Sequence, residues 1–142
     1  MSDAVGIVVL VGRILFTVYF LGAAMGHLTQ GGMMVGYARS KGFPLAFGAG
    51  WPAGVWLIVG ALSVLLGVWP ELGALLLGLF VVVTALGIHQ FWTIQDPAQR
   101  QAEMLNFTRN ATFLGAAIAL FGFFAEEGGD LKFALLKPLI HF

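Results

Sequence analysis

Four long apolar runs dominate this sequence and decide what it can fold into. They cover about residues 5–28, 51–69, 72–92 and 105–125, and each approaches the 20 or so residues that a helix needs to cross about 30 Å of hydrocarbon. Only 10% of the 142 residues are charged and 59% are hydrophobic, whereas soluble domains carry about a quarter charged residues. The sequence therefore predicts a single all-α integral membrane domain, an antiparallel four-helix bundle with almost no soluble part.

The connections between the runs indicate how the helices are arranged. Pro70 and Glu71 leave room only for a tight turn, so the second and third helices must be antiparallel. Residues 29–50 are too rich in glycine for a fifth span, and a short interfacial helix or a re-entrant loop between the first two helices fits better. Residues 131–142 alternate lysines with large apolar side chains, which favours an amphipathic tail on the membrane surface.

Small residues recur at a spacing of four along the apolar runs, a pattern that lets helix backbones approach closely in a membrane. The pairs are Gly22/Gly26, Gly50/Gly54, Ala74/Gly78 and Gly115/Ala119. We expect close helix packing at these positions, with a glycine-lined space for a flat ligand as the alternative. The positive residues are nearly balanced between the two sides, so the sequence does not determine the orientation in the membrane.

Composition excludes several kinds of chemistry for this chain alone. Without cysteine it has no thiolate nucleophile, no disulfide exchange and no Cys-ligated zinc or iron–sulfur cluster. Seven Lys and Arg balance seven Asp and Glu, so the net charge does not indicate a nucleic-acid partner. Because the sequence has no phosphate loop, no nucleophile–base–acid set and no carboxylate pair for a di-metal site, we predict no catalytic residue and no metal site.

Polar side chains that are distant in the sequence are expected to meet near one membrane face. Four antiparallel spans place the end of the first run, the end of the third and the start of the fourth on the same side. The residues found there are His27, His89, Trp92, Arg109 and Asn110. We predict that these five form a candidate ligand site near the interface.

Three interpretations of these residues are open. Histidine commonly hydrogen-bonds a quinone carbonyl, so the site suits a quinone ring or a lipid head group. Two neutral imidazoles also suit a haem iron, but we disfavour haem because its histidine ligands usually lie deeper in the membrane. The simplest interpretation is that His27 and His89 only anchor helix ends at the interface.

Arg13 is the only strong charge in the first apolar run. It precedes His27 by 14 residues, nearly four helical turns, so Arg13, Tyr19 and His27 share one stripe of the helix. A charge at this depth costs at least about 2.5–3.5 kcal/mol on insertion scales, so we expect Arg13 to face the bundle interior. Glu71 is its predicted carboxylate partner, with Glu126, Glu127 or trapped water as the alternatives. Arg13 either locks the first helix to its neighbours or takes part in function.

Several short motifs in and beside the apolar runs form a recognisable set. They are Arg13-Ile14-Leu15, Phe20-Leu21-Gly22, Gly26-His27-Leu28, Gly60, Gly67, His89-Gln90-Phe91-Trp92, Asn106-Phe107-Thr108-Arg109-Asn110-Ala111 and Leu114-Gly115-Ala116. With these motifs the sequence resembles the DoxX family of small four-helix membrane proteins, over about residues 10–124. Two positions depart from the family pattern: His27 stands where many members have lysine, and apolar residues around Trp56 stand where a glutamate is often found.

The resemblance implies a redox-linked accessory role. The namesake of the family is associated with a terminal quinol oxidase and with thiosulfate-to-quinone electron transfer, and relatives have been placed in membrane oxidoreductase assemblies that handle thiol and oxidative stress. It thus implies a multi-pass protein of a bacterial inner membrane that anchors or assists a redox enzyme, with quinone as a candidate ligand. Lipid, oxidoreductase subunits and further copies of the chain are the candidate partners. The alternative functions are a non-enzymatic transporter or lipid-handling bundle and a purely structural scaffold.

Overall fold

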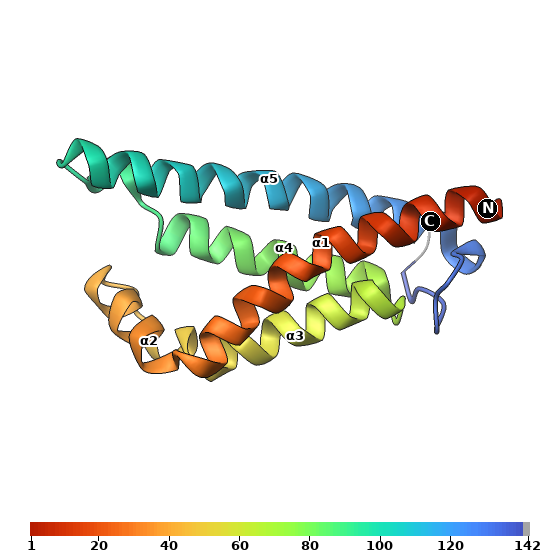
Figure 1. Ribbon diagram of the computed structural model, residues 1–142, viewed down its shortest axis with the longest axis horizontal. Helices are drawn as coiled ribbons and strands as arrows, with labels where there is room; N and C mark the ends of the chain where they lie inside the picture. The colour runs from red at the N-terminus through yellow and green to blue at the C-terminus, as the bar shows by residue number, and fades with distance from the viewer. Residues whose placement is uncertain (141–142) are drawn as a thin grey trace.

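The computed structural model describes residues 1–140, which form an all-helical molecule (Figure 1). Four long helices run along it, and each is antiparallel to the next: α1 (Asp3–Thr29), α3 (Trp51–Leu66), α4 (Pro70–Gly87) and α5 (Pro97–Glu127). α3 packs on α1 and α4, and α4 packs on α5. The chain termini lie at one end of the molecule, and the short helix α2 (Gly31–Ser40) lies at the other (Figure 1).

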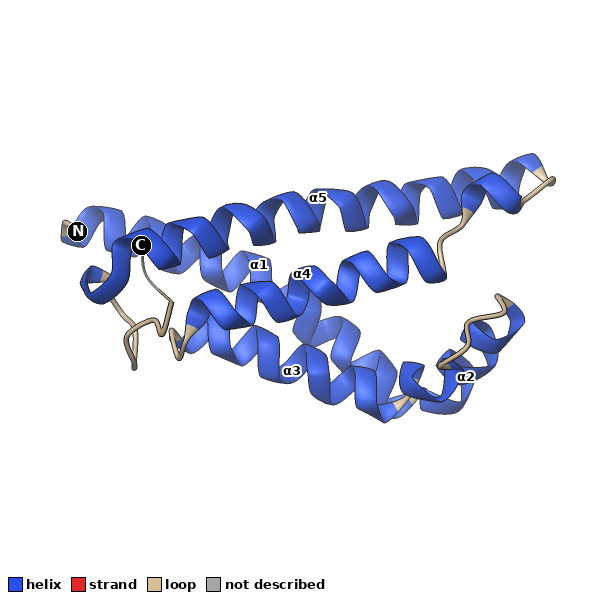
Figure 2. Cartoon of the chain, turned by 180° about the vertical axis from the view of Figure 1, so that it is seen from behind, coloured by secondary structure: helices blue, strands red, loops and turns tan. Residues whose placement is uncertain are grey.

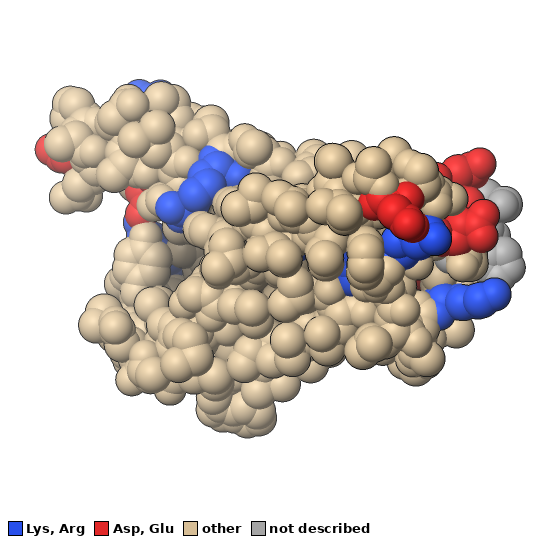
Figure 3. Space-filling view, turned by 45° about the vertical axis from the view of Figure 1, so that its right-hand side comes forward, with Lys and Arg blue, Asp and Glu red and all other residues tan. Residues whose placement is uncertain are grey.

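Three helices are long and apolar enough to cross a membrane. They are α1, α5 and the segment Pro70–Thr93, which joins α4 to the short helix η2 (Phe91–Thr93). α3 is equally apolar, but its 16 residues measure only about 24 Å, less than the hydrocarbon thickness of about 30 Å. On the face that Figure 3 shows, charged side chains gather toward the two ends and the surface between them is uncharged. The predicted all-helical membrane class is confirmed, and the fourth span stays a prediction.

α5 begins earlier than the sequence analysis expected. The fourth run was predicted from about residue 105, whereas the helix starts at Pro97. Proline is tolerated in a first turn, and the Asp96 carboxylate accepts a hydrogen bond of 2.8 Å from the backbone N–H of Gln99, as an N-cap residue does. The extra turns place Glu103 on a helix that faces α2 and the end of α4.

α3 and α4 approach each other through glycine. A Cβ atom on Gly73 would lie 2.5 Å from Ser63 Oγ and 2.8 Å from the carbonyl oxygen of Gly60, closer than such contacts occur. The backbone oxygen cannot move aside as a flexible side chain would. Gly73 therefore permits the tight turn and close packing that hold these two helices together.

The predicted small-residue pairs have different outcomes. A Cβ atom on Gly54 would lie 2.7 Å from the Leu28 side chain, so α1 and α3 do pack closely there. Gly22 and Gly115, by contrast, have nothing within 4 Å of such an atom, and close packing at these two positions is not observed in the described residues. Both face outward, because the helices turn other stripes toward their neighbours.

The C-terminal tail folds back under the turn between α3 and α4 (Figure 2). After the short helix η3 (Gly128–Asp130), the N–H groups of Leu135 and Leu136 each donate a 3.0 Å hydrogen bond, to Leu66 O and Gly67 O. Gly67 ends α3 with φ +65°, and a Cβ there would lie 2.6 Å from Ala134 Cβ. The tail predicted over 131–142 is thus bound to the protein through its backbone. Contact of its exposed apolar side chains with the membrane stays a prediction, and residues 141 and 142 lie outside the described residues.

Candidate functional site

A cavity of about 440 Å³ lies at the end of the molecule that carries α2. Its walls come from α1, α2, the loop with the short helix η1 (Ala46–Ala49), the start of α3, and parts of α4 and α5. Most of the lining is apolar, and seven phenylalanine, tyrosine and tryptophan rings contribute to it: Tyr19, Phe20, Tyr37, Phe43, Phe47, Trp56 and Phe80. Figure 3 shows a recess near this end of the molecule with basic and acidic atoms beside it. The volume lies in the range of small-molecule binding sites.

The structure places most of the predicted site residues on this one cavity. His27, His89, Arg109 and Asn110 all line it, and so does Tyr19. These residues come from α1, the end of α4 and α5, as the antiparallel arrangement requires. Among the described residues, however, Trp92 is not part of the lining.

Trp92 lies on the outside of the molecule instead. Its side chain is half exposed and packs edge-on against the rings of Phe91 and Phe107, at centroid distances of 5.3 and 5.8 Å. The chain leaves helical geometry after Gly87, which turns the Trp92 side chain away from the bundle. This arrangement suits an interfacial anchor.

His27 is held by the backbone of the loop before α3. Its Nδ1 atom lies 2.6 Å from the carbonyl oxygen of Ala49, and its ring stands edge-on to Phe80 at a centroid distance of 5.9 Å. Because a carbonyl oxygen can only accept a hydrogen bond, Nδ1 must carry the proton. The other nitrogen of the neutral ring, Nε2, is then an acceptor.

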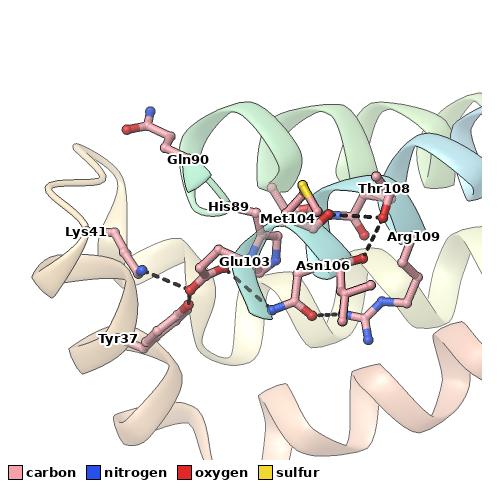
Figure 4. A network of polar contacts seen from close by, with 12 residues as sticks. Tyr37, Lys41, His89, Gln90, Glu103, Met104, Asn106, Thr108 and Arg109 are labelled. Carbon is pink, nitrogen blue, oxygen red and sulfur yellow. Dashed lines mark hydrogen bonds and ion pairs between the residues drawn. The ribbon is translucent and has the colours of Figure 1, made fainter. Parts of the chain in front are cut away.

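Glu103 is the centre of a polar network beside the cavity (Figure 4). One of its carboxylate oxygens accepts hydrogen bonds from the Tyr37 hydroxyl and from Lys41 Nζ, the latter at 2.9 Å. The other accepts from His89 Nδ1 at 2.7 Å, and Asn106 Nδ2 lies 3.5 Å from it. The carboxylate is nearly buried, with 8% of the residue exposed. It therefore ties the segment around α2 to the end of α4 and to α5.

Glu103 is not among the predicted site residues, because the apolar run that predicts the last helix begins only at about residue 105. Two signals point to it: the Asp96-Pro97 start of a helix, and its spacing from Asn106 and Asn110. Residues three and seven positions apart share one face of a helix. Read together, these signals put Glu103 beside the two asparagines.

Tyr37 has a raised pKa, and the network explains it. Burial around its hydroxyl is the largest cause, followed by the hydrogen bond to Glu103 and the negative charge of that carboxylate. Tyr37 is 39% exposed as a residue, but its hydroxyl points at the nearly buried carboxylate of Glu103. Ionising Tyr37 would therefore place two negative charges in contact.

Arg109 and Asn110 complete the polar part of the cavity from α5. The Arg109 guanidinium lies over the Tyr19 ring, 5.6 Å from its centroid, and donates a 3.0 Å hydrogen bond to Asn106 Oδ1. Asn110 is nearly buried and donates from Nδ2 to the Thr84 hydroxyl at 2.9 Å. Arg109 remains exposed, so its charge is available at the edge of the cavity.

Arg13 lies at the opposite end of the molecule, away from the cavity. Its side chain is fully buried and donates to Val64 O at 2.8 Å, to Leu65 O at 2.5 Å and to Phe133 O at 3.0 Å. Val64 and Leu65 belong to the last turn of α3, whose carbonyls lack partners within the helix and form its negative end. The guanidinium therefore caps α3 and joins it to the tail.

The predicted ion pair between Arg13 and Glu71 does not form within the described residues. Glu71 is also fully buried, but its Oε1 accepts hydrogen bonds from the backbone of Leu139 at 2.7 Å and of Ile140 at 3.2 Å. Its other oxygen has no hydrogen-bond partner among residues 1–140. The returning tail supplies both residues with backbone partners, and this replaces the expected side-chain pair.

The polar atoms of the cavity are suited to hydrogen bonding and to proton exchange. Within residues 1–140 there is no group of three or more His, Asp and Glu residues that could hold a metal ion. The fold and the site together define a small helical membrane protein with a largely apolar cavity near one end.

Comparison with known proteins supplies the family. The DoxX family model matches residues 8–90, more than half of the chain. The chain belongs to the DoxX family. The match includes His27 and His89 and ends before Arg109 and Asn110. A search of curated proteins and a search of solved structures return no significant match.

Proposed function

We propose that this DoxX-family protein is an accessory subunit of a quinone-linked redox assembly in a bacterial inner membrane, and that its cavity holds a quinone ring or a lipid head group. The chain binds the ligand and docks on an oxidoreductase that carries the electrons. It is not catalytic alone. Oxidoreductase subunits and further copies of this chain are its proposed protein partners.

The observation that carries this proposal is the composition of the cavity wall. Aromatic side chains such as Phe80 and Trp56 surround most of its volume, and His27, His89 and Arg109 stand together within it. A quinone combines a flat apolar ring with polar oxygens, and a lipid combines an apolar chain with a polar head. Both match a cavity that is apolar over most of its wall and polar in one part.

In the proposed membrane arrangement α3 is the fourth span. α1 and α4 run in the same direction, from the end with the termini to the end with α2 (Figure 1). If both cross the membrane, the chain between them must return, and α3 is the helix that runs back. A helix of 16 residues suffices where the bilayer thins locally around the protein.

Isolation of the protein from its native membranes in mild detergent tests the proposal. We expect chromatography of an organic extract to detect quinone, and mass spectrometry to detect a co-purifying oxidoreductase subunit. An Ala23→Phe substitution places a ring in the cavity, because Ala23 lines it. Ala119→Phe adds the same ring on an exposed face of α5 and serves as the control.

The outcomes separate the candidate functions. The proposal predicts that Ala23→Phe loses the bound quinone and that Ala119→Phe retains it. Absence of both quinone and an oxidoreductase from the wild-type preparation would count against the proposal. Phospholipid that is lost in Ala23→Phe, with no oxidoreductase present, would favour a lipid-handling bundle instead.

A further inference from the structure

We propose that the cavity selects the reduced, dihydroxy form of a quinone ring over the oxidised, dicarbonyl form, because the nitrogens that its two histidines present to a ligand are hydrogen-bond acceptors. This inference rests on the proposed function and names the ligand state that the same site prefers. It depends on which atoms of His27, His89 and Asn110 are already engaged by the protein.

The tautomer of His27 follows from its neighbour. Nδ1 lies 2.6 Å from Ala49 O, which has no proton to give, so the proton of the neutral ring is on Nδ1. Nε2 then carries a lone pair. A ligand hydroxyl can donate to it, whereas a ligand carbonyl presents a second lone pair and makes no hydrogen bond.

Glu103 holds Nδ1 of His89 as a hydrogen-bond donor in the same way. The carboxylate receives donors on both oxygens, from Tyr37 and Lys41 on one and from His89 on the other. Such a carboxylate acts only as an acceptor, so His89 Nδ1 must also carry a proton. In the neutral ring His89 Nε2 is again an acceptor. Glu103 is thus a positioning residue that sets the tautomer of His89.

Asn110 adds a third acceptor. The Thr84 hydroxyl donates its one proton to a carbonyl of its own helix, with Phe80 O at 3.0 Å, and so it must accept from the amide nitrogen of Asn110. This assigns the amide orientation, and leaves Asn110 Oδ1 for a ligand. Arg109 supplies donors nearby, and a quinol oxygen can accept from Arg109 while its proton is donated to a histidine.

These free atoms are accessible from the cavity. Across the described residues, the buried side-chain polar atom without a hydrogen-bond partner is Glu71 Oε2, at the other end of the molecule. Within residues 1–140, neither His27 Nε2 nor His89 Nε2 has a hydrogen-bond partner in the protein, so both are open to a ligand or to solvent. Both rings line the cavity, which is the space that such a ligand would occupy.

Binding of three related probes to the purified protein in detergent micelles tests the inference. The probes are a decyl-substituted 1,4-benzoquinol, the corresponding quinone and the 1,4-dimethoxy ether of the quinol, which cannot donate a hydrogen bond. Calorimetric titration under argon gives the dissociation constants, and the sequence has no cysteine whose thiol could add to the quinone. We expect the quinol to bind about 10- to 100-fold more tightly than either other probe, the effect of leaving one or two acceptors unpaired.

A pair of variants locates the preference. His27→Phe keeps a flat ring but removes an acceptor, and we expect the preference for quinol to fall at least severalfold. Ala119→Phe changes an exposed position of α5 outside the cavity lining, and we expect it to keep the wild-type preference. The comparison of quinol with ether in the wild-type protein needs no variant, so it holds even if His27→Phe folds poorly.

Two results would overturn the inference, and they differ in what else they remove. Equal or tighter binding of the quinone would refute selection of the reduced form but leave the quinone site in place. Absence of binding by all three probes would remove the site and the proposed function together.

Discussion

Replacing Arg13 by leucine is the most direct test of how this membrane protein is held together. The substitution removes a fully buried guanidinium that joins α1 to the end of α3 and to the tail. Leucine fits an apolar environment and leaves α1 able to cross the membrane. What is lost is therefore the set of hydrogen bonds to backbone carbonyls.

The magnitude follows from these bonds. Three of them, to Val64, Leu65 and Phe133, are 3.0 Å or shorter. A hydrogen bond with a charged partner contributes about 1.5–3 kcal/mol, and removing the charge recovers about 2.5–3.5 kcal/mol of insertion cost. The free energy of unfolding should therefore fall by about 1–6.5 kcal/mol, with a midpoint of about 4 kcal/mol.

The measurement is unfolding of the purified protein in mixed micelles by titration with a denaturing detergent, followed by tryptophan fluorescence. Arg39→Leu removes an exposed guanidinium from α2 and should change stability by less than about 0.5 kcal/mol. Arg13→Lys keeps the charge but not the planar fork, and should fall between wild type and Arg13→Leu. Because Arg13 is not among the cavity residues, ligand binding by the folded variant should be unchanged.

Two outcomes would refute this reasoning. If Arg13→Leu were as stable as Arg39→Leu, the carbonyl contacts would not stabilise the bundle. If Arg13→Leu folded with normal stability but lost ligand binding, Arg13 would have a functional role that its place in the fold does not explain.

Three further predictions concern other parts of the molecule. Gly73→Val should lower the free energy of unfolding by more than about 2 kcal/mol in the same assay, because the valine side chain would collide with Ser63 and with the carbonyl oxygen of Gly60. Gly115→Ala should have almost no effect, because there is open space at that position. Glu103→Gln should weaken the contacts that Tyr37 and Lys41 make with residue 103, and hydrogen exchange at residues 37–41 should become faster. Glu126→Gln, at an exposed position, should leave this exchange unchanged. In a Tyr19→Phe background Tyr37 is the only tyrosine, and its ultraviolet titration should show ionisation well above the ordinary pKa of about 10. Because the pKa of Tyr37 is raised in the folded protein, the stability that protonated Tyr37 contributes is complete below about pH 10 and is lost at higher pH. Ionisation of Tyr37 at the ordinary tyrosine pKa of about 10 would contradict this prediction.

The sequence alone was enough to determine the membrane class, the family resemblance and the end of the molecule where the polar residues meet. Apolar run length is a local property that hydrocarbon thickness makes decisive. Short turns then alternate the helix directions, so His27, His89 and Asn110 had to reach the same end. Their shared cavity follows from connectivity more than from any specific contact.

Only the tertiary structure decided which atoms these residues bind. Arg13 contacts Phe133, 120 residues later in the chain, and no helical pattern predicts where an irregular tail places its carbonyl groups. Glu103 similarly depends on the position of α2, which brings Tyr37 and Lys41 to it from 66 and 62 residues away. Hydrophobicity determines which helices enter the membrane, but hydrogen bonds require positions within a few tenths of an ångström, and those positions exist only once distant segments have packed.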